Sequence, residues 1–407
     1  MDKLAWLVLA LSLLLGCDAE VGSEPCTGTR CEEPPDSLVV PLMVDYTRVS
    51  AQAPLDLPIV STTASPCNLP CNEPIRLLRA GGDAAWTLSR TGGPPTLKLL
   101  QASGASTEVR LAEPEGGATT GSLYIHGVPG GSALAHVLWS LPKGDNLDEL
   151  ALIKQPGELL RLPLLGARPP RGAIAAPLGY LLFDAVPQRD LRALIAPALP
   201  TGALRLVDGR GATLWQQARF PKYALAVGTS AVALADSFVV GAADGTQLGS
   251  KYGLLSVDAT GKLTRFGTSA DSSWYSTRLV SLGQGAYAVA AESELHGVVD
   301  AAAKGNIDVM IDRGDPNALT GFRLERFCLF ELKLYGFSAD DAGNLYVSSV
   351  TGERDAPRGL LCELPVVGAA RCFQGPPNQL FGEIVATGEG SLFVVAGEQI
   401  LRVQLPK

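Results

Sequence analysis

The stretch GEGSLFVVAGEQILRVQL, residues 388–405, decides the fold class. It contains two apolar runs, SLFVVA and QILRVQL, each of strand length and separated by a short segment with Gly. Strand-length apolar runs joined by a Gly-bearing turn are typical of β-hairpins. The stretch DAGNLYVSSV, residues 341–350, has the same form, because a turn with Gly leads into an apolar run. The C-terminal part of the chain is therefore predicted to consist of antiparallel hairpins.

Hairpins of this form recur along the chain with a period near 52 residues. The first marker is the turn glycine of six apolar hairpins, found at Gly104, Gly157, Gly209, Gly261, Gly314 and Gly368, at intervals of 53, 52, 52, 53 and 54 residues. The second marker is a strand after a Gly-bearing turn, centred at Trp86, Tyr124, Leu181, Val232, Tyr287, Tyr346 and Phe393. Its mean spacing is about 51 residues, so two markers share one period.

Repeats of about 40–50 residues with two hairpins each are the pattern of propeller blades. We therefore predict an all-β chain that forms a β-propeller of seven four-stranded blades, with six and eight as alternatives. The next outer hairpin would fall near residue 421, roughly one period after Gly368 and beyond Lys407, so the last blade lacks an outer strand. Residues 38–49 (LVVPLMVDYTRV) have no repeat partner. We expect this N-terminal segment to complete the last blade and close the ring.

The two stretches quoted above resemble the blade hairpins of NHL-type repeat propellers. Blades of that family carry a D-x-x-G-N-L-Y-V-A-like sequence, and DAGNLYVSSV resembles it. The resemblance is clear in residues 341–350 and 388–405 and diffuse elsewhere. It implies the propeller fold and no particular activity, because one fold supports many functions.

Composition and charge exclude two classes of protein. The 407 residues are 46% hydrophobic and 18% charged, with 45 Gly and 29 Pro, which is not the composition of a disordered chain. The net charge is −8 and no long basic run occurs, so nucleic acid is not expected as a partner.

The N-terminus has the order of parts found in an export signal. Residues 4–15 form an apolar run that is too short to span a bilayer, and its end reads Leu14-Leu15-Gly16-Cys17. This ending resembles the lipobox of bacterial lipoproteins, which implies cleavage before Cys17 and a lipid on its thiol. An ordinary secretory signal, or a short apolar strand, is the alternative. We expect a signal peptide at 1–16, an acidic Pro- and Gly-rich tether at 17–37 and the propeller at 38–407, anchored to a membrane of the cell envelope on its periplasmic or surface face.

The chain has eight cysteines, and oxidising conditions after export permit disulfides. Three local pairs have suitable spacing: Cys26 with Cys31, Cys67 with Cys71, and Cys362 with Cys372. The last pair would face each other across two strands if residues 366–368 form a hairpin turn. Cys328 is then left without a partner. Zinc is the competing interpretation of the clustered cysteines, but their spacing without a nearby His is weak for a metal site.

The sequence has no HExxH, GxSxG, P-loop or EF-hand pattern, and Ser140-Leu141-Pro142-Lys143 matches SxxK but contains a Pro that opposes the helical turn this motif needs. We predict neither a cofactor nor a metal site. The three histidines (His126, His136, His296) are far apart or lack a third ligand, and the aspartates in 308–315 and 340–341 fit polar turns better than a calcium loop. Residues 268–278 (TSADSSWYSTR) read as an irregular segment with aromatic residues among polar ones. We expect a ligand-contact surface there, made of Asp271, Trp274, Tyr275 and Arg278, although Trp274 could instead fill a gap between blades.

These observations predict a lipid-anchored binding or scaffolding module whose partner is an envelope protein or a glycan. The alternative is a metal-dependent propeller hydrolase or lactonase with its site in the central channel. Bound metal in the purified protein would favour that alternative.

Overall fold

The computed structural model describes residues 39–51, 55–64, 77–80, 83–89, 96–111, 119–128, 132–140, 142, 146–155, 158–163, 172–176, 178–184, 203–208, 212–217, 223–225, 231–244, 252–295, 304–325, 332–353, 356–388 and 390–406. The chain divides into two units, Met1–Pro34 and Pro35–Lys407, and every described residue belongs to the second. All regular elements among the described residues are β-strands, which confirms the all-β prediction.

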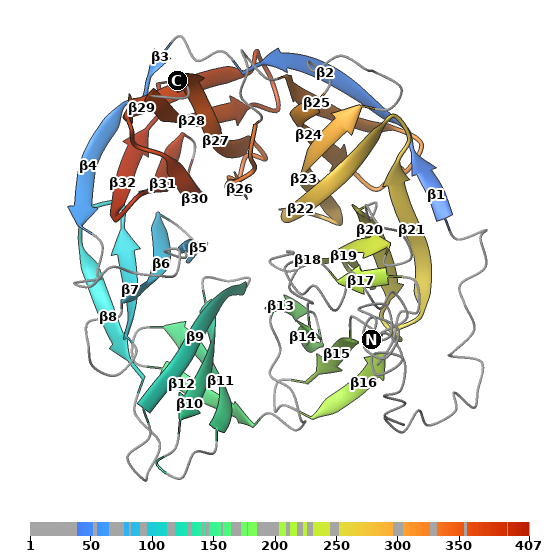
Figure 1. Ribbon diagram of the computed structural model, residues 1–407. Helices are drawn as coiled ribbons and strands as arrows, with labels where there is room; N and C mark the ends of the chain where they lie inside the picture. The colour runs from blue at the N-terminus through green and yellow to red at the C-terminus, as the bar shows by residue number, and fades with distance from the viewer. Residues whose placement is uncertain are drawn as a thin grey trace, which may run out of the picture. The chain divides into compact units, whose positions relative to one another are not determined.

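Most strands form four-stranded antiparallel groups in which neighbours along the chain pair (Figure 1). The first group contains β5 (Leu77–Arg79), β6 (Ala84–Ser89), β7 (Thr96–Gln101) and β8 (Ser106–Arg110). The second contains β9 (Thr119–Val128), β10 (Ser132–Ser140), β11 (Asn146–Gln155) and β12 (Glu158–Pro163). The third contains β13 (Gly172–Ala176), β14 (Gly179–Asp184), β15 (Ala203–Val207) and β16 (Thr213–Gln217).

The next two groups are joined, and together with β1 and β2 from the N-terminal segment they form one eleven-stranded sheet. The first contains β17 (Tyr223–Leu225) and β18 (Ala231–Ala233), both paired with β19 (Ser237–Asp244), then β20 (Tyr252–Asp258) and β21 (Leu263–Ser269). The second contains β22 (Ser272–Gly283), β23 (Ala286–Leu295), β24 (Lys304–Asp312) and β25 (Leu319–Glu325). A single pairing, Tyr252 with Trp274, links β20 to β22.

The C-terminal strands form two further groups. One contains β26 (Gly336–Ala339), β27 (Leu345–Glu353), β28 (Ala356–Leu364) and β29 (Arg371–Pro377). The other contains β30 (Phe381–Gly388), β31 (Ser391–Ala396) and β32 (Gln399–Gln404), with β4 (Ile59–Ala64) as its fourth strand.

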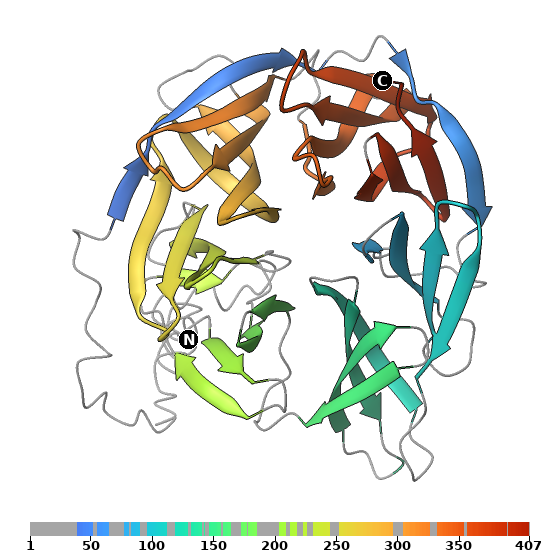
Figure 2. The same cartoon turned by 180° about the vertical axis from the view of Figure 1, so that it is seen from behind.

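The N-terminal segment runs along the outer strands of four successive groups, as Figures 1 and 2 show in blue. β1 (Val39–Leu42) pairs in parallel with β21, β2 (Val44–Ser50) with β25, and β3 (Leu55–Asp56) with β29, each as an added outer strand. β4 alone pairs antiparallel, with β32. The expectation that residues 38–49 complete the last blade is therefore wrong. An N-terminal strand does complete that sheet, but it lies further along the chain, because residues 39–50 are used on earlier outer edges.

β17 and β18 both pair with β19, and β18 is counted here as the first strand of that group. The first strand of each group then contacts the first strand of the next. β5 contacts β9, β9 contacts β13, β13 contacts β18, β18 contacts β22, β22 contacts β26, β26 contacts β30, and β30 contacts β5.

The first sequence marker corresponds to the turn between the last two strands of six groups; the seventh group has β4 in place of a hairpin partner of β32. Where the turn glycine is described, it has the positive φ that favours Gly: Gly104 (89°), Gly261 (87°), Gly314 (92°) and Gly368 (111°). The second marker is less uniform. Tyr124 lies in β9 and Val232 in β18, which are first strands, whereas the other five centres lie in second strands. Both strand types are apolar, so composition alone does not distinguish them.

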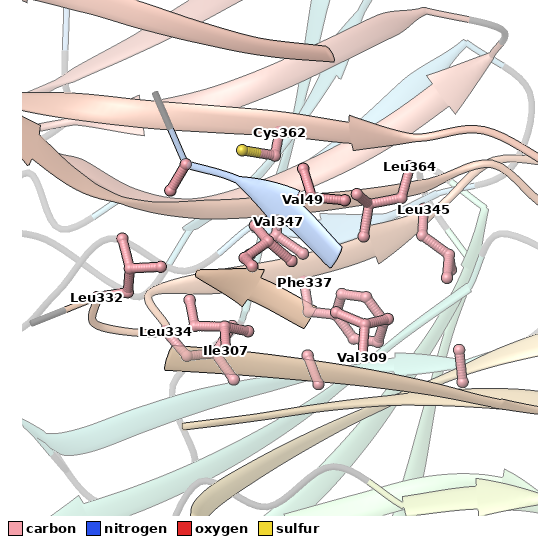
Figure 3. Packing of buried hydrophobic residues seen from close by; sticks show 14 of the residues in the cluster. Val49, Ile307, Val309, Leu332, Leu334, Phe337, Leu345, Val347, Cys362 and Leu364 are labelled. Carbon is pink, nitrogen blue, oxygen red and sulfur yellow. The ribbon is translucent and has the colours of Figure 1, made fainter. Parts of the chain in front are cut away.

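Buried apolar side chains gather between neighbouring groups. Figure 3 shows one such cluster, in which Val49 of β2, Ile307 and Val309 of β24 meet Phe337 of β26 and Val347 of β27. Comparable clusters join β5–β7 to β30–β32 and β27–β29 to β30–β32. Each sheet thus buries apolar residues against its neighbour, since a single sheet cannot cover both of its own faces.

The predicted disulfide of the β28–β29 hairpin is present. Cys362 and Cys372 are directly opposite in register and are bonded, with 4.1 Å between their Cα atoms. Cys17, Cys26, Cys31, Cys67, Cys71 and Cys328 lie outside the described residues.

Candidate functional site

The four predicted contact residues lie on the inner strand β22 and the short link before it. Residues 263–269 and 272–283 are strands, so the expectation of an irregular segment is wrong. The register of β22 against β23 shifts between the pairs Trp274–Ser293 and Ser276–Glu292. This shift is a β-bulge at Tyr275, and a bulge turns a side chain away from the regular alternation of a strand.

Trp274 is not the exposed contact residue that we expected. Only 1% of it is exposed, and it packs in a cluster with Tyr252 and Leu254 of β20. Its indole Nε1 donates a hydrogen bond to Asp308 Oδ2 at 3.3 Å. The ring therefore fills the space between two groups of strands, as the alternative interpretation held.

Beside Trp274 lies a buried ionic network centred on Arg323 of β25. Arg323 Nε donates to Asp308 Oδ1 at 2.7 Å, and its Nη2 donates to Oδ2 at 3.0 Å. Its Nη1 donates to Asp271 Oδ2 at 3.0 Å. The side chain of Asp308 is 0% exposed and that of Arg323 is 6% exposed. A carboxylate this deeply buried needs a cation, and Arg323 supplies one with two parallel bonds.

Hydroxyl groups complete the network at the start of β22. Ser272 Oγ donates to Asp308 Oδ2 at 2.7 Å, and Ser269 Oγ donates to Asp271 Oδ1 at 3.1 Å. Burial by itself would raise the pKa of Asp271, but the hydrogen bonds and charge of Arg323 and the bond from Ser269 lower it below its ordinary value. The link from β21 to β22 is thereby fixed at its bend.

The network also reaches the N-terminal segment. The Arg323 guanidinium lies over the ring of Tyr46 in β2, with 4.3 Å from Cζ to the ring centroid. Such stacking is a favourable cation–π contact. Burial, together with the nearby charge of Asp308, raises the pKa of Tyr46, so the phenol stays neutral. Charge, hydroxyl and aromatic groups from β2, β22, β24 and β25 therefore meet at Arg323.

Tyr275 is the predicted contact residue that reaches the surface. It is 43% exposed, and its hydroxyl donates to Glu294 Oε2 at 2.5 Å. This hydrogen bond, with some burial and the charge of Glu294, raises the pKa of Tyr275 to about 12. Glu294 comes from β23, so the ring is held between two strands. A held aromatic ring loses little entropy when a partner binds it.

Arg278 lies away from the surface around Tyr275 and interacts with a different group of strands. Its Nη1 lies 3.8 Å from Oε1 of Glu383 in β30. Glu383 Oε2 also accepts a hydrogen bond from the Leu77 amide of β5 at 3.0 Å. Between β22 and β30 lies β26, whose Gly336 has no room for a side chain, since a Cβ there would meet Gly382 O at 2.9 Å.

Two further bonds of this kind occur nearby. Glu292 Oε1 of β23 accepts from the Leu334 amide at 2.8 Å, and Arg79 of β5 donates to the Ala339 carbonyl at 3.4 Å. The polar side chains of Arg278, Glu292, Glu383 and Arg79 thus bond one group of strands to another.

The remaining sequence candidates do not converge. Asp312 and Asp340 accept amide hydrogen bonds within their own turns, from Gly314 at 2.8 Å and from Asn344 at 2.9 Å. Across β9 and β10, His136 pairs with Tyr124 and His126 with Leu134, so the two histidines are not opposite each other. Within the described part of the chain, no three His, Cys, Asp or Glu residues gather as a metal site. The same residues include no helix with the length and apolar character needed to cross a membrane.

The pair Asp308–Arg323 is the feature that the sequence interpretation missed. Its signal was a charged residue inside each of two apolar strands, NIDVMID and TGFRLE. Opposite charges at facing positions of two adjacent strands indicate a buried pair.

Comparisons with known proteins give a likeness of fold only. No protein-family model matches this sequence, and no curated protein matches it. An ulvan lyase of a new polysaccharide lyase family is similar in structure, with 11% identity, 86% of this chain and 94% of that chain covered, and a TM-score of 0.45. The WD40 domain of Toxoplasma gondii coronin has 11% identity, coverages of 87% and 89%, and a TM-score of 0.44. A protein of unknown function from Dyadobacter fermentans has 10% identity, coverages of 86% and 99%, and a TM-score of 0.36.

Proposed function

We propose that the chain is a closed seven-bladed propeller that acts as a binding module of the bacterial envelope, held to the membrane by a lipid on Cys17. The cyclic order of contacts among β5, β9, β13, β18, β22, β26 and β30 supports seven blades. The pairing of β4 with β32 supports closure, because it joins strands from opposite ends of the chain. Antiparallel blades that shield one another's faces are the propeller solution to exposed sheet edges.

The exposed ring of Tyr275 is the observation that carries the binding role. The bulge in β22 brings this ring to the surface, and Glu294 holds its hydroxyl. Asp271 lies four residues earlier, with 52% of its side chain exposed and its carboxylate fixed by Arg323. An aromatic ring beside the carboxylate of Glu294 suits a glycan or a polar protein surface, because both offer hydroxyl or amide donors.

Site-specific crosslinking in living cells tests this binding surface. A photoreactive amino acid is placed at Tyr275 and, as a control, at Val367, which is 87% exposed at the tip of the β28–β29 hairpin. We expect a discrete adduct with one envelope protein or glycan at Tyr275 and none at Val367. Equal products at both positions, or a stoichiometric catalytic metal in the purified protein, would contradict a binding role for this surface.

The anchor has its own test. The run that ends in Leu15-Gly16-Cys17 supports lipid attachment at that thiol. Growth with a clickable fatty acid should label the wild-type protein, and Cys17→Ser should remove the label. Equal labelling of both proteins would show that Cys17 carries no lipid.

A further inference from the structure

Residues 39–51, here called the strap, lie on two groups of strands that have five members (β17–β21) and four members (β22–β25) without it. β1 adds four residue pairs to β21 and β2 adds seven to β25, all in parallel register. At the ends of these pairings the Ala270 amide donates to the Leu42 carbonyl at 3.2 Å, and the Ala51 amide donates to the Glu325 carbonyl at 3.0 Å. The strap is thus bound mainly as an added edge strand, which is a mode by which proteins bind extended peptides.

Two glycines in the outer strands form seats for strap side chains. A Cβ on Gly267 of β21 would lie 2.9 Å from Leu42 Cδ2, and one on Gly321 of β25 would lie 3.2 Å from Tyr46 Cδ1. Leu42 is 4% exposed in its seat. Tyr46 is covered on one face by the guanidinium of Arg323. Side-chain seats of this kind add sequence specificity to the backbone bonds of an added strand.

The strap presents two different faces to its surroundings. Leu42, Val49 and Ala51 are buried against the body, at 4%, 9% and 1% exposure. The intervening residues Asp45 and Thr47 are exposed. The inward residues are apolar or aromatic. The outward residues from Asp45 to Ser50 are polar, whereas Val39 and Met43 leave apolar side chains at 44% and 72% exposure. Burial of one face only is the pattern of a strand that docks on one side.

We propose that the outer edges of β21 and β25 are a docking site for the strap as a separable segment, with Leu42 and Tyr46 as its specificity residues. The occupant is the strap of the same chain. This proposal rests on the proposed anchor, because the strap is the described segment nearest in sequence to Cys17. The body is then held to its anchor by strand docking as well as by the covalent chain, and it stays attached when the chain is cut between β2 and β3.

The test uses the full lipidated chain in vesicles, with a protease recognition sequence in place of residues 52–54. After cutting, vesicles are sedimented and the body is followed in pellet and supernatant over time. We expect the cut wild-type body to stay in the pellet. Tyr46→Ala should release it about tenfold faster, the change expected from losing roughly 1.4 kcal/mol of contact. Tyr46→Phe, which keeps the ring over Arg323, and Thr47→Ala, an exposed residue of the same strand, should both behave like the wild type.

Immediate release of the cut wild-type body, at a rate that Tyr46→Ala does not change, would overturn the docking site. A parallel experiment separates this outcome from failure of the anchor. In a Cys17→Ser chain with an affinity tag before residue 38, the cut body should still be recovered on the tag. Mixing that chain with an untagged, differently labelled copy shows whose strap is bound. Recovery of the labelled copy's body on the tag would overturn the assignment of the strap to its own chain.

Discussion

Replacement of Arg323 by Met tests the buried ionic network most severely. The change removes the cation that pairs with Asp308 through bonds of 2.7 and 3.0 Å, while the carboxylate stays at 0% exposure. Removing one partner of a buried pair leaves an uncompensated charge and costs about 3–5 kcal/mol. We therefore expect the free energy of unfolding of Arg323→Met to fall by about that amount.

The double variant Arg323→Met with Asp308→Leu separates the charge effect from packing. It removes both charges of the buried pair together, so the cost that it adds is the loss of acceptors for Ser272 Oγ and Trp274 Nε1, about 1 kcal/mol each. The contacts of Arg323 with Asp271 and Tyr46 are lost in the single and the double variant alike. The double variant should therefore be more stable than Arg323→Met alone by about 1–3 kcal/mol. Arg48→Met is the control, because its pair with Glu325 at 3.1 Å is largely exposed and should contribute less than about 1 kcal/mol.

Urea unfolding followed by circular dichroism measures these free energies in all four proteins, and tryptophan fluorescence checks that one transition is seen by both probes. If Arg323→Met costs no more than Arg48→Met, or if the double variant is less stable than the single, the network is not the buried charge pair described above.

Three further changes have defined outcomes. Gly359→Ala should destabilise the protein by at least about 1–3 kcal/mol in thermal unfolding, because its Cβ would lie 2.3 Å from the buried ring of Phe381; unchanged melting would contradict that packing. Cys362→Ala with Cys372→Ala should cost about 3 kcal/mol, from the loop entropy of a ten-residue separation, and an unchanged urea midpoint would show that the bridge does not constrain the chain. In acid titrations, Asp271 should stabilise the wild type above its ordinary pKa of 3.8, and this contribution should be lost as the pH falls through the lowered pKa of the folded protein. Asp271→Asn should lack that part of the pH dependence of the free energy of unfolding. Identical acid transitions of the two proteins would contradict the lowered pKa.

Strand content and blade spacing could be predicted from the sequence because both have local causes. A hairpin needs apolar alternation and a turn residue that tolerates positive φ, and Gly104, Gly261, Gly314 and Gly368 supply that turn. The bridge between Cys362 and Cys372 followed for the same reason, since the turn at Gly368 fixes which residues are opposite.

The route of the N-terminal segment could not be predicted from repeat counting. Parallel edge pairing is set by distant seats such as Gly267 and Gly321, and a glycine in a strand has no sequence mark that distinguishes a seat from a bend. The interpretation of Trp274 as a surface contact failed for a related reason. Its ring packs against Tyr252 of β20, and its indole donates a hydrogen bond to Asp308, 34 residues away. Neither partner is visible from local composition.

The central claim is that the chain closes on itself through β4 and β32. Ser61 and Arg402 are opposite in that pairing, although they lie at opposite ends of the described chain. Cysteines placed at these two positions, treated with a short thiol crosslinker and mapped by mass spectrometry, measure the closure directly. The account predicts an intramolecular crosslink between the two peptides in the native monomer and its loss in urea. Absence of that link in the folded protein, or its appearance only between two chains, would contradict closure.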